Sequence, residues 1–212
     1  MMSLAPIIAV ALALPSLWRA YPIDVRTFKV LERDSGPNNY YRVVDGEPES
    51  FIRGVYEISA GTVTLFTEVP GELRRGVRRM HWRWRALVLP LGGNECVSGR
   101  GDSAANVYVT WKRGLRWYSL KFVWSSEAAA NTTCNGIRSP LVFSDSVVLR
   151  SGGPLGVWHD EEIDPDALFR QHFADGDPDA KVPELQGIGL MSDGDQTRSL
   201  SAADYAGFIL YK

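Results

Sequence analysis

The fold class is decided by the stretch NVYVTWKRGLRWYSLKFVW, residues 106–124. Apolar and polar residues alternate in both halves, and a period of two with bulky side chains is typical of a half-buried β-strand. The Arg113-Gly114 pair between the halves predicts the tip of a hairpin. The stretch therefore predicts two antiparallel strands. Their apolar faces carry Val107, Val109 and Trp111 in the first strand and Tyr118, Leu120, Phe122 and Trp124 in the second.

Strand signals of the same kind recur on both sides of this hairpin. The runs are short and are separated by Gly, Pro, Asn and Asp turns, without repeats or a change in composition that would mark a second domain. This order predicts an all-β protein, a two-sheet antiparallel β-sandwich with one short helix. The further strands are expected over residues 26–31, 40–44, 51–58, 61–69, 81–89, 141–150, 185–191 and 205–211.

The one expected helix spans residues 166–173. Asp164 can cap its first turn, and Pro165 suits the first helical position. Phe169 and Phe173 lie four residues apart and would share a face. We expect this helix to close one end or edge of the sandwich.

Composition excludes several classes of protein. The chain has 212 residues, of which 45% are hydrophobic and 23% charged, as in ordinary globular domains. Disordered, collagenous, coiled-coil and multi-span membrane proteins are excluded. A net charge of −2 gives no reason to expect a nucleic-acid partner.

The charge is unevenly spread along the chain. Residues 72–121 hold 11 Lys or Arg against three acids, whereas residues 158–204 hold 12 acids against three Lys or Arg. Two interpretations stay open. The two segments could lie side by side and attract one another, or they could form a basic face for an anionic ligand and an acidic loop set for a cation.

The N-terminus predicts export. Residues 4–18 are nearly uncharged, too short for a comfortable membrane span and about the length of the apolar core of a secretory signal. We expect a signal over residues 1–20, cut near Ala20 or retained, and a single domain over residues 21–212. The alternative is a buried N-terminal strand. No later segment is expected to span a membrane.

The two cysteines, Cys96 and Cys134, both lie in loop-like stretches. This placement favours a disulfide between loops if the compartment is oxidising, although two free thiols remain the alternative. Together with the signal, the pair predicts a periplasmic or secreted protein.

The acidic segment SDGDQT, residues 192–197, is similar to a loop that binds a hard cation. Calcium prefers several carboxylate and carbonyl oxygens on a flexible turn. Asp193 and Asp195 are therefore candidate Ca²⁺ ligands. The alternative is a turn held by the hydrogen bonds of its own aspartates. No other cofactor is expected.

Seven tryptophans suggest either an aromatic core or an aromatic platform for sugars. Trp111 and Trp117 are expected to face each other across the hairpin or to pack diagonally. The candidate ligand contacts combine aromatic rings with polar partners for hydroxyl groups. They are Trp84, Arg85, Asp102, Trp117, Tyr118, Trp124 and Trp158.

An ordered set of landmarks resembles a known bacterial family. The set runs from HWRWR (81–85) through GDSAANVYV (101–109) to GIGLMSDGD (187–195) and ADYAG (203–207). It resembles the domain of unknown function family 3047 of exported bacterial proteins, over Phe28 to Lys212. The resemblance implies a jelly roll similar to galactose-binding domains, many of which bind glycans and some a structural calcium.

Three hypotheses for function follow. The first is a non-catalytic, exported β-sandwich that binds a glycan or envelope polysaccharide. The second is a structural or protein-interaction domain of the cell envelope. The third is a polysaccharide hydrolase or lyase, which would need two converging carboxylates.

Overall fold

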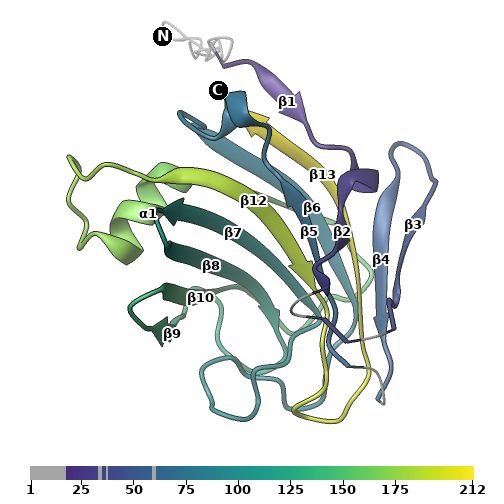
Figure 1. Cartoon of the computed structure of the whole chain (residues 1–212). Coiled ribbons are helices and arrows are strands. Elements are labelled where there is room, and N and C mark those ends of the chain that lie inside the picture. Colours follow the sequence, from purple (N-terminus) through teal and green to yellow (C-terminus); the bar gives the residue numbers. More distant parts are fainter. Residues whose placement is uncertain (1–17, 33–34, 37, 59–60) are drawn as a thin grey trace, which may run out of the picture.

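The computed structural model describes residues 18–32, 35–36, 38–58 and 61–212. Nearly all of the expected signal segment lies outside these residues. Within them, the chain forms two β-sheets packed face to face with one α-helix, so the predicted β-sandwich of jelly-roll type is confirmed (Figure 1). None of the described helices is long and apolar enough to cross a membrane.

The first sheet, sheet A, has the strand order β11-β6-β13-β4-β3, and β1 also pairs with β13. Every strand pair in it is antiparallel. Its strands are β1 (Ala20–Pro22), β3 (Tyr41–Val44), β4 (Phe51–Tyr56), β6 (Arg79–Val88), β11 (His159–Ile163) and β13 (Ser201–Tyr211).

The second sheet, sheet B, has the order β2-β5-β12-β7-β8-β10-β9. All of its pairs are antiparallel except β8 and β10, which run parallel. Its strands are β2 (Lys29–Val30), β5 (Thr64–Glu68), β7 (Ala105–Arg113), β8 (Arg116–Ser125), β9 (Thr133–Arg138), β10 (Val142–Ser151) and β12 (Glu184–Met191).

Most expected strands are confirmed. The differences are one expected strand that forms only in part, a 3₁₀-helix after β5, and three strands that were not expected. Residues 26–31 are only partly a strand, because the 3₁₀-helix η1 (Val25–Thr27) precedes β2. A second 3₁₀-helix, η3 (Gly71–Leu73), follows β5. The strands β1, β9 and β11 were not expected. Two of them, β9 and β11, form sheet edges.

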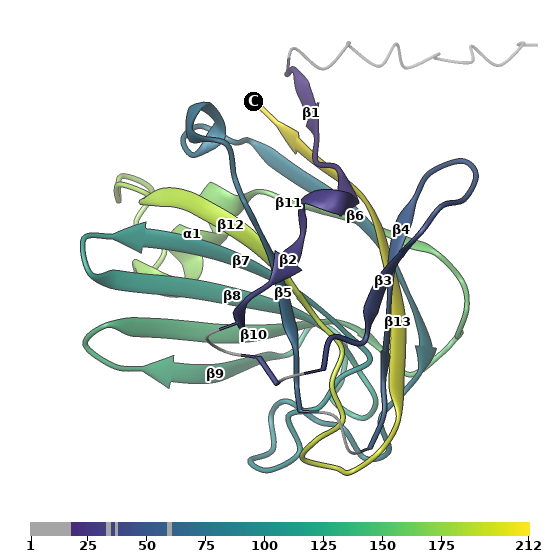
Figure 2. The same ribbon diagram turned by 45° about the vertical axis from the view of Figure 1, so that its right-hand side comes forward.

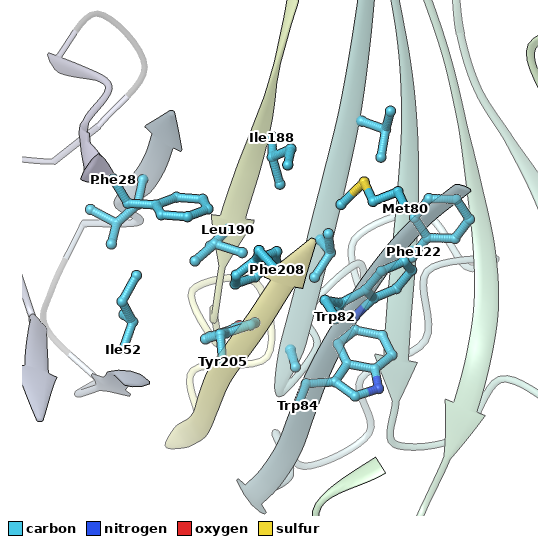
Figure 3. Close-up of a cluster of buried hydrophobic side chains, with 14 of the residues drawn as sticks. Phe28, Ile52, Met80, Trp82, Trp84, Phe122, Ile188, Leu190, Tyr205 and Phe208 are labelled. Atoms are coloured by element: carbon cyan, nitrogen blue, oxygen red, sulfur yellow. The ribbon is translucent and has the colours of Figure 1, made fainter. Parts of the chain in front are cut away.

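The core lies between the sheets and is dominated by tryptophan. Trp82 and Trp84 project from the same face of β6 and are fully buried, as their alternation predicted (Figure 3). The ring of Trp82 lies 5.4 Å from that of Phe122 on sheet B, and the ring of Trp84 lies 5.9 Å from that of Trp124. These contacts join the two sheets at their centre.

The register of the hairpin corrects one prediction. Trp111 pairs with Tyr118, and Lys112 pairs with Trp117. Residues directly opposite in an antiparallel pair share a face, so Trp111 points into the core and Trp117 points out. The expectation that Trp111 and Trp117 face each other or pack diagonally is therefore wrong.

The helix α1 (Pro165–Phe173) closes one end of the sandwich. The Asp164 carboxylate accepts the backbone N–H of Ala167, as the capping pattern predicted. Phe169 packs against Trp111 and Tyr118 at ring distances of 5.6 and 5.1 Å. At the other end of sheet B, the loops over residues 89–104 and 192–200 gather together (Figures 1 and 2).

The basic and acidic segments of the chain lie side by side. On sheet A, Arg79 pairs with Glu162 at 2.9 Å and Arg85 pairs with Asp204 at 2.8 Å. Arg75 pairs with Glu184 of sheet B at 3.1 Å. Attraction between the two segments therefore explains much of the uneven distribution of charge along the chain.

The central contact between the sheets can be tested by truncation. Replacing Trp82 by Ala removes a fully buried indole and should lower the free energy of unfolding by about 3–5 kcal/mol. The matched control is Trp117→Ala, at a residue on the outer face that is 39% exposed, which should cost less than about 1 kcal/mol. Urea unfolding measures both, and equal losses would contradict this assignment of core and surface.

Candidate functional site

The outer face of sheet B carries a groove of about 570 Å³ that crosses five strands and the residue after β2. Its position follows from the alternation of each strand. Val107, Val109, Leu120 and Phe122 are buried between the sheets, so the residues between them face outward. The groove is lined by Leu31, Thr64, Phe66, Tyr108, Thr110, Trp117, Ser119, Val142 and Gly189.

Gly189 of β12 lines the groove, and Gly187 on the same face of that strand lies under Phe66. A Cβ atom at Gly187 would lie 2.1 Å from Cζ of Phe66, so only glycine lets the Phe66 ring lie across the sheet. A Cβ atom at Gly189 would lie 3.2 Å from Cβ of Tyr108. Because these positions have no side chains, the Phe66 ring can lie over Gly187, and the groove is open at Gly189.

Trp117 is the most exposed aromatic side chain of the groove. The residue is 39% exposed, and the Nζ atom of Lys112 lies 4.7 Å from the centroid of its ring. This cation–π contact orients the indole and leaves a large part of it open to the groove. Thr110 and Ser119 form the next pair along the same strands and contribute hydroxyl groups beside the rings.

A buried charged cluster lies at the loop end of sheet B. A disulfide between Cys96 and Cys134 ties the loop after β6 to β9, so the predicted pairing is confirmed. Next to Cys96, burial raises the pKa of the Glu95 carboxyl. Both Glu95 oxygens are buried and lack a hydrogen-bond partner of ordinary geometry among the described residues.

The positive charge of Lys121 offsets the negative charge of the carboxyl groups in this cluster. Burial by itself lowers the pKa of Lys121, but Tyr108, Asp193, Glu95 and Asp102 outweigh it and raise that pKa. Burial also raises the pKa of Asp193 to about 7, against the opposing charge of Lys121. The loop end therefore combines one ammonium group with several carboxyl groups in a protected environment.

Three carboxylates come together near this cluster. Oxygen atoms of Asp102, Asp193 and Asp195 all lie within 4.8 Å of one another. Asp102 accepts the backbone N–H groups of Gln196 and Thr197, and Asp193 accepts that of Ser103. The set has the oxygen ligands that a hard cation prefers. Sequence analysis paired Asp193 with Asp195 and did not join Asp102 to them, because it lies far away in the chain.

Three of the predicted ligand contacts lie in the core. Trp84, Tyr118 and Trp124 are 0, 6 and 1% exposed. The indole N–H of Trp84 donates to Glu161, and that of Trp124 donates to the carbonyl of Gly152. These rings present no face to a ligand. They support the sheets from within, so their assignment as contact residues is wrong.

The remaining predicted contacts lie in three separate places. Trp117 lines the groove of sheet B, and Asp102 belongs to the carboxylate set. Arg85 and Trp158 lie on the outer face of sheet A, where the guanidinium is 4.7 Å from the indole centroid. Arg85 also binds the fully buried Asp204. The structure therefore does not bring the predicted set together.

Two groove residues, Phe66 and Tyr108, were missed by sequence analysis. Both lie at outward positions of strands that the sequence did predict. Their alternation with the buried Leu65 and Val107 was the available signal. This signal was not used because the candidate contacts were chosen mainly among the tryptophans.

The buried Glu95 predicts a pH effect on stability. Because its pKa is raised in the folded protein, ionisation of this group destabilises the fold as pH rises above the ordinary value of 4.5. Glu95→Gln removes that loss, so the variant should gain stability relative to the parent as pH rises above 4.5. Urea unfolding at several pH values measures this difference. The exposed Glu127→Gln should show no such trend.

Comparisons with known proteins give distant structural likeness. The family 11 carbohydrate-binding module of Clostridium thermocellum, in complex with a β-1,3-1,4-mixed-linked tetrasaccharide, is 10% identical, with 91% of this chain and 87% of that chain covered and a TM-score of 0.38. The xyloglucanase domain of NopAA from Sinorhizobium fredii, in complex with cellobiose, is 10% identical, with 92 and 96% covered and a TM-score of 0.49. A cellulase derived from Cel12A of Rhodothermus marinus is 9% identical, with 92 and 100% covered and a TM-score of 0.48.

At these identities, the likeness concerns the fold alone. The comparison with curated proteins found no match. The family comparison, in contrast, covers most of the chain, because one model matches residues 26–209. The chain belongs to DUF3047, a family of proteins of unknown function.

Proposed function

We propose that this chain binds carbohydrate, without catalysis, in the groove on the outer face of sheet B. The observation that carries the proposal is the groove of about 570 Å³, bordered by the rings of Phe66, Tyr108 and Trp117. Pockets of this size, mostly apolar with a few polar groups, are typical of small-molecule sites. The expected ligand is a glycan or envelope polysaccharide.

The chemistry of the lining suits sugar rings. The C–H faces of a sugar pack on the face of an aromatic side chain, and its hydroxyl groups need partners at the edges. Trp117 offers a partly open indole. The hydroxyl groups of Thr64, Thr110 and Ser119 lie beside the rings. The groove crosses several strands, so an extended chain fits it better than a single sugar.

Binding is favoured over hydrolysis by the position of the acids. Cleavage of a glycosidic bond uses two carboxyl groups about 5–10 Å apart beside the substrate. The nine lining residues include no carboxylate. Glu95 and Asp193 lie at the loop end, where the Glu95 oxygens are buried. A hydrolase or lyase therefore stays the less favoured alternative, tested by release of reducing ends from any polysaccharide that binds.

The disulfide supports a location outside the cytoplasm. Cys96 and Cys134 are paired, and such bonds form and persist in oxidising compartments. We therefore place the protein in the periplasm or among secreted proteins. Fractionation of the producing cells tests this part of the proposal.

The groove assignment is tested by one substitution on each sheet. Trp117→Ala removes the most exposed ring of the groove and should weaken glycan binding at least tenfold, because a stacked aromatic ring contributes about 1.5 kcal/mol or more. Isothermal titration against the polysaccharides retained in a binding screen measures this.

The matched control is Trp158→Ala, which removes an indole from the opposite sheet and should leave the affinity unchanged. Loss of binding in Trp158→Ala with retention in Trp117→Ala would move the site to sheet A. A folded protein that binds no glycan would favour the alternative, a structural or protein-interaction domain of the envelope.

We also propose that Asp102, Asp193 and Asp195 hold a structural Ca²⁺. A cation bound only by the folded state raises stability by about 2.7 kcal/mol at 100 times its dissociation constant. Millimolar CaCl₂ should therefore raise the melting temperature by several degrees, and a chelator should reverse the increase. Differential scanning calorimetry measures both.

Asp195 is exposed, so Asp195→Asn should leave the fold intact and remove the response to calcium. Asp179→Asn, in a separate acidic loop, is the control and should retain it. An equal increase in the Asp195 variant, or an equal increase with MgCl₂, would contradict the site.

A further inference from the structure

Each aromatic residue of the groove has a lysine as its direct partner on a neighbouring strand. Lys29 of β2 pairs with Phe66, Lys112 of β7 pairs with Trp117, and Lys121 of β8 pairs with Tyr108. Residues opposite in an antiparallel pair share a face, so all three lysines lie on the groove side of sheet B. Two of the ammonium groups also lie over the rings, at 4.7 Å from Trp117 and 5.9 Å from Tyr108.

None of these three lysines forms an ion pair with a described residue within 4.0 Å. Two acids at outward positions of the same sheet are already paired. Glu68 binds Arg74 at 3.1 Å, and Glu184 binds Arg75 at 3.1 Å. The groove therefore has positive charges whose counter-ions are not in contact with them.

The three lysines differ in their surroundings. Lys121 has Glu95, Asp102 and Asp193 near enough to raise its pKa, so its end of the groove is partly compensated. Lys29 is exposed and Lys112 is half-buried. Glu184 is the direct partner of Lys112 on β12, but no ion pair within 4.0 Å joins them, and the Glu184 carboxylate binds Arg75 at 3.1 Å. The strongest attraction for an anion is therefore at Lys29 and Lys112, beside Phe66 and Trp117.

Hydrogen-bonding groups on β8 and β10 also favour an anionic ligand. The outward positions there carry Ser119, Lys121, Ser144 and Ser146, which offer hydroxyl or ammonium donors. No side chain among these outward residues is a carboxylate or carboxamide. The serine hydroxyl groups donate and accept and therefore suit any glycan, whereas the ammonium groups only donate and form their strongest hydrogen bonds with carboxylates.

We propose that the ligand of this groove is an anionic polysaccharide, a chain of sugars that carry carboxylate groups. The inference rests on the proposed carbohydrate binding and names its ligand class. The rings of Phe66 and Trp117 hold the sugar faces, and the lysine beside each ring binds a carboxylate. Because Lys112 and Lys121 are displaced by four residues along the hairpin, about 13 Å, repeated charges are needed to reach both.

Single-stranded nucleic acid is the other polyanion that binds to lysines interleaved with aromatic rings. The net charge of −2 and the disulfide disfavour it, because they fit neither a general nucleic-acid binder nor a reducing compartment. Nucleic acid is therefore included in the test as a competing outcome.

The test compares three probes on the full chain with its disulfide intact. These are polyuronates (polygalacturonate and alginate), a neutral mixed-linked β-glucan, and single-stranded polythymidylate. We expect the polyuronates to bind most tightly at about 0.05 M NaCl and to weaken strongly at about 0.5 M, where exposed charges are screened. Isothermal titration gives the dissociation constants.

Lysine variants connect the binding to the groove. Lys29→Gln and Lys112→Gln should each weaken polyuronate binding about fivefold to tenfold, and Lys112→Arg should restore most of it. Lys212→Gln, at an exposed lysine that follows β13 of sheet A, is the matched control and should have no effect. Circular dichroism confirms that each variant is folded.

The outcomes separate this inference from the proposal on which it rests. Equal or tighter binding of the neutral glucan, lost in Trp117→Ala but unchanged in the lysine variants, would overturn the anionic ligand and leave carbohydrate binding in place. Tighter binding of polythymidylate would overturn the ligand class in favour of nucleic acid. Absence of binding to all three probes would overturn both proposals.

Discussion

The structure depends on the packing of Trp82 and Trp84 against sheet B. Their indoles fill the space between the sheets and contact Phe122 and Trp124 at ring distances of 5.4 and 5.9 Å. A sandwich holds two inner faces about 10 Å apart, and large rings fill that distance from one side. Because the inner face of sheet B is fixed by these contacts, its outward residues are fixed as well. The groove is a consequence of how the core is packed.

Because alternation and capping are local patterns, the sequence predicted the helix and most of the strands, but not β1, β9 and β11. Asp164, Pro165 and the buried positions of residues 81–86 and 118–124 were all confirmed. The site residues were predicted poorly because residue type was given more weight than the alternation of the strands. Trp84 and Trp124 were selected for their type, although their own alternation placed them in the core. Asp102 and Asp193 meet only through long-range folding, which no spacing rule reveals.

The same local patterns could not give the register between strands. The hairpin tip was predicted at Arg113 and Gly114, but Arg113 pairs with Arg116, so the turn is one residue later, at Gly114 and Leu115. The pairing of Lys112 with Trp117 was not predicted. A difference of one residue in register moves a side chain from the core to the surface. The lysine partners of the groove aromatics are also set by register. Lys29 and Phe66, for example, come from strands that are distant in the sequence, and only the folded sheet makes them neighbours.

The charged residues on the two outer faces of the sandwich differ in whether they have partners of opposite charge within the protein. This difference separates charges that stabilise the fold from charges that a ligand can use. On sheet A, Arg53 and Arg85 both bind the buried Asp204, and removing these partners would leave a buried carboxylate with a large desolvation cost. Arg53 and Arg85 are therefore required for the stability of the fold. On sheet B, Lys29 and Lys112 have no carboxylate of a described residue in contact, so removing their charge costs the fold little. A ligand there would meet cations whose attraction is not already used within the protein, and this supports the proposal that the ligand binds on sheet B.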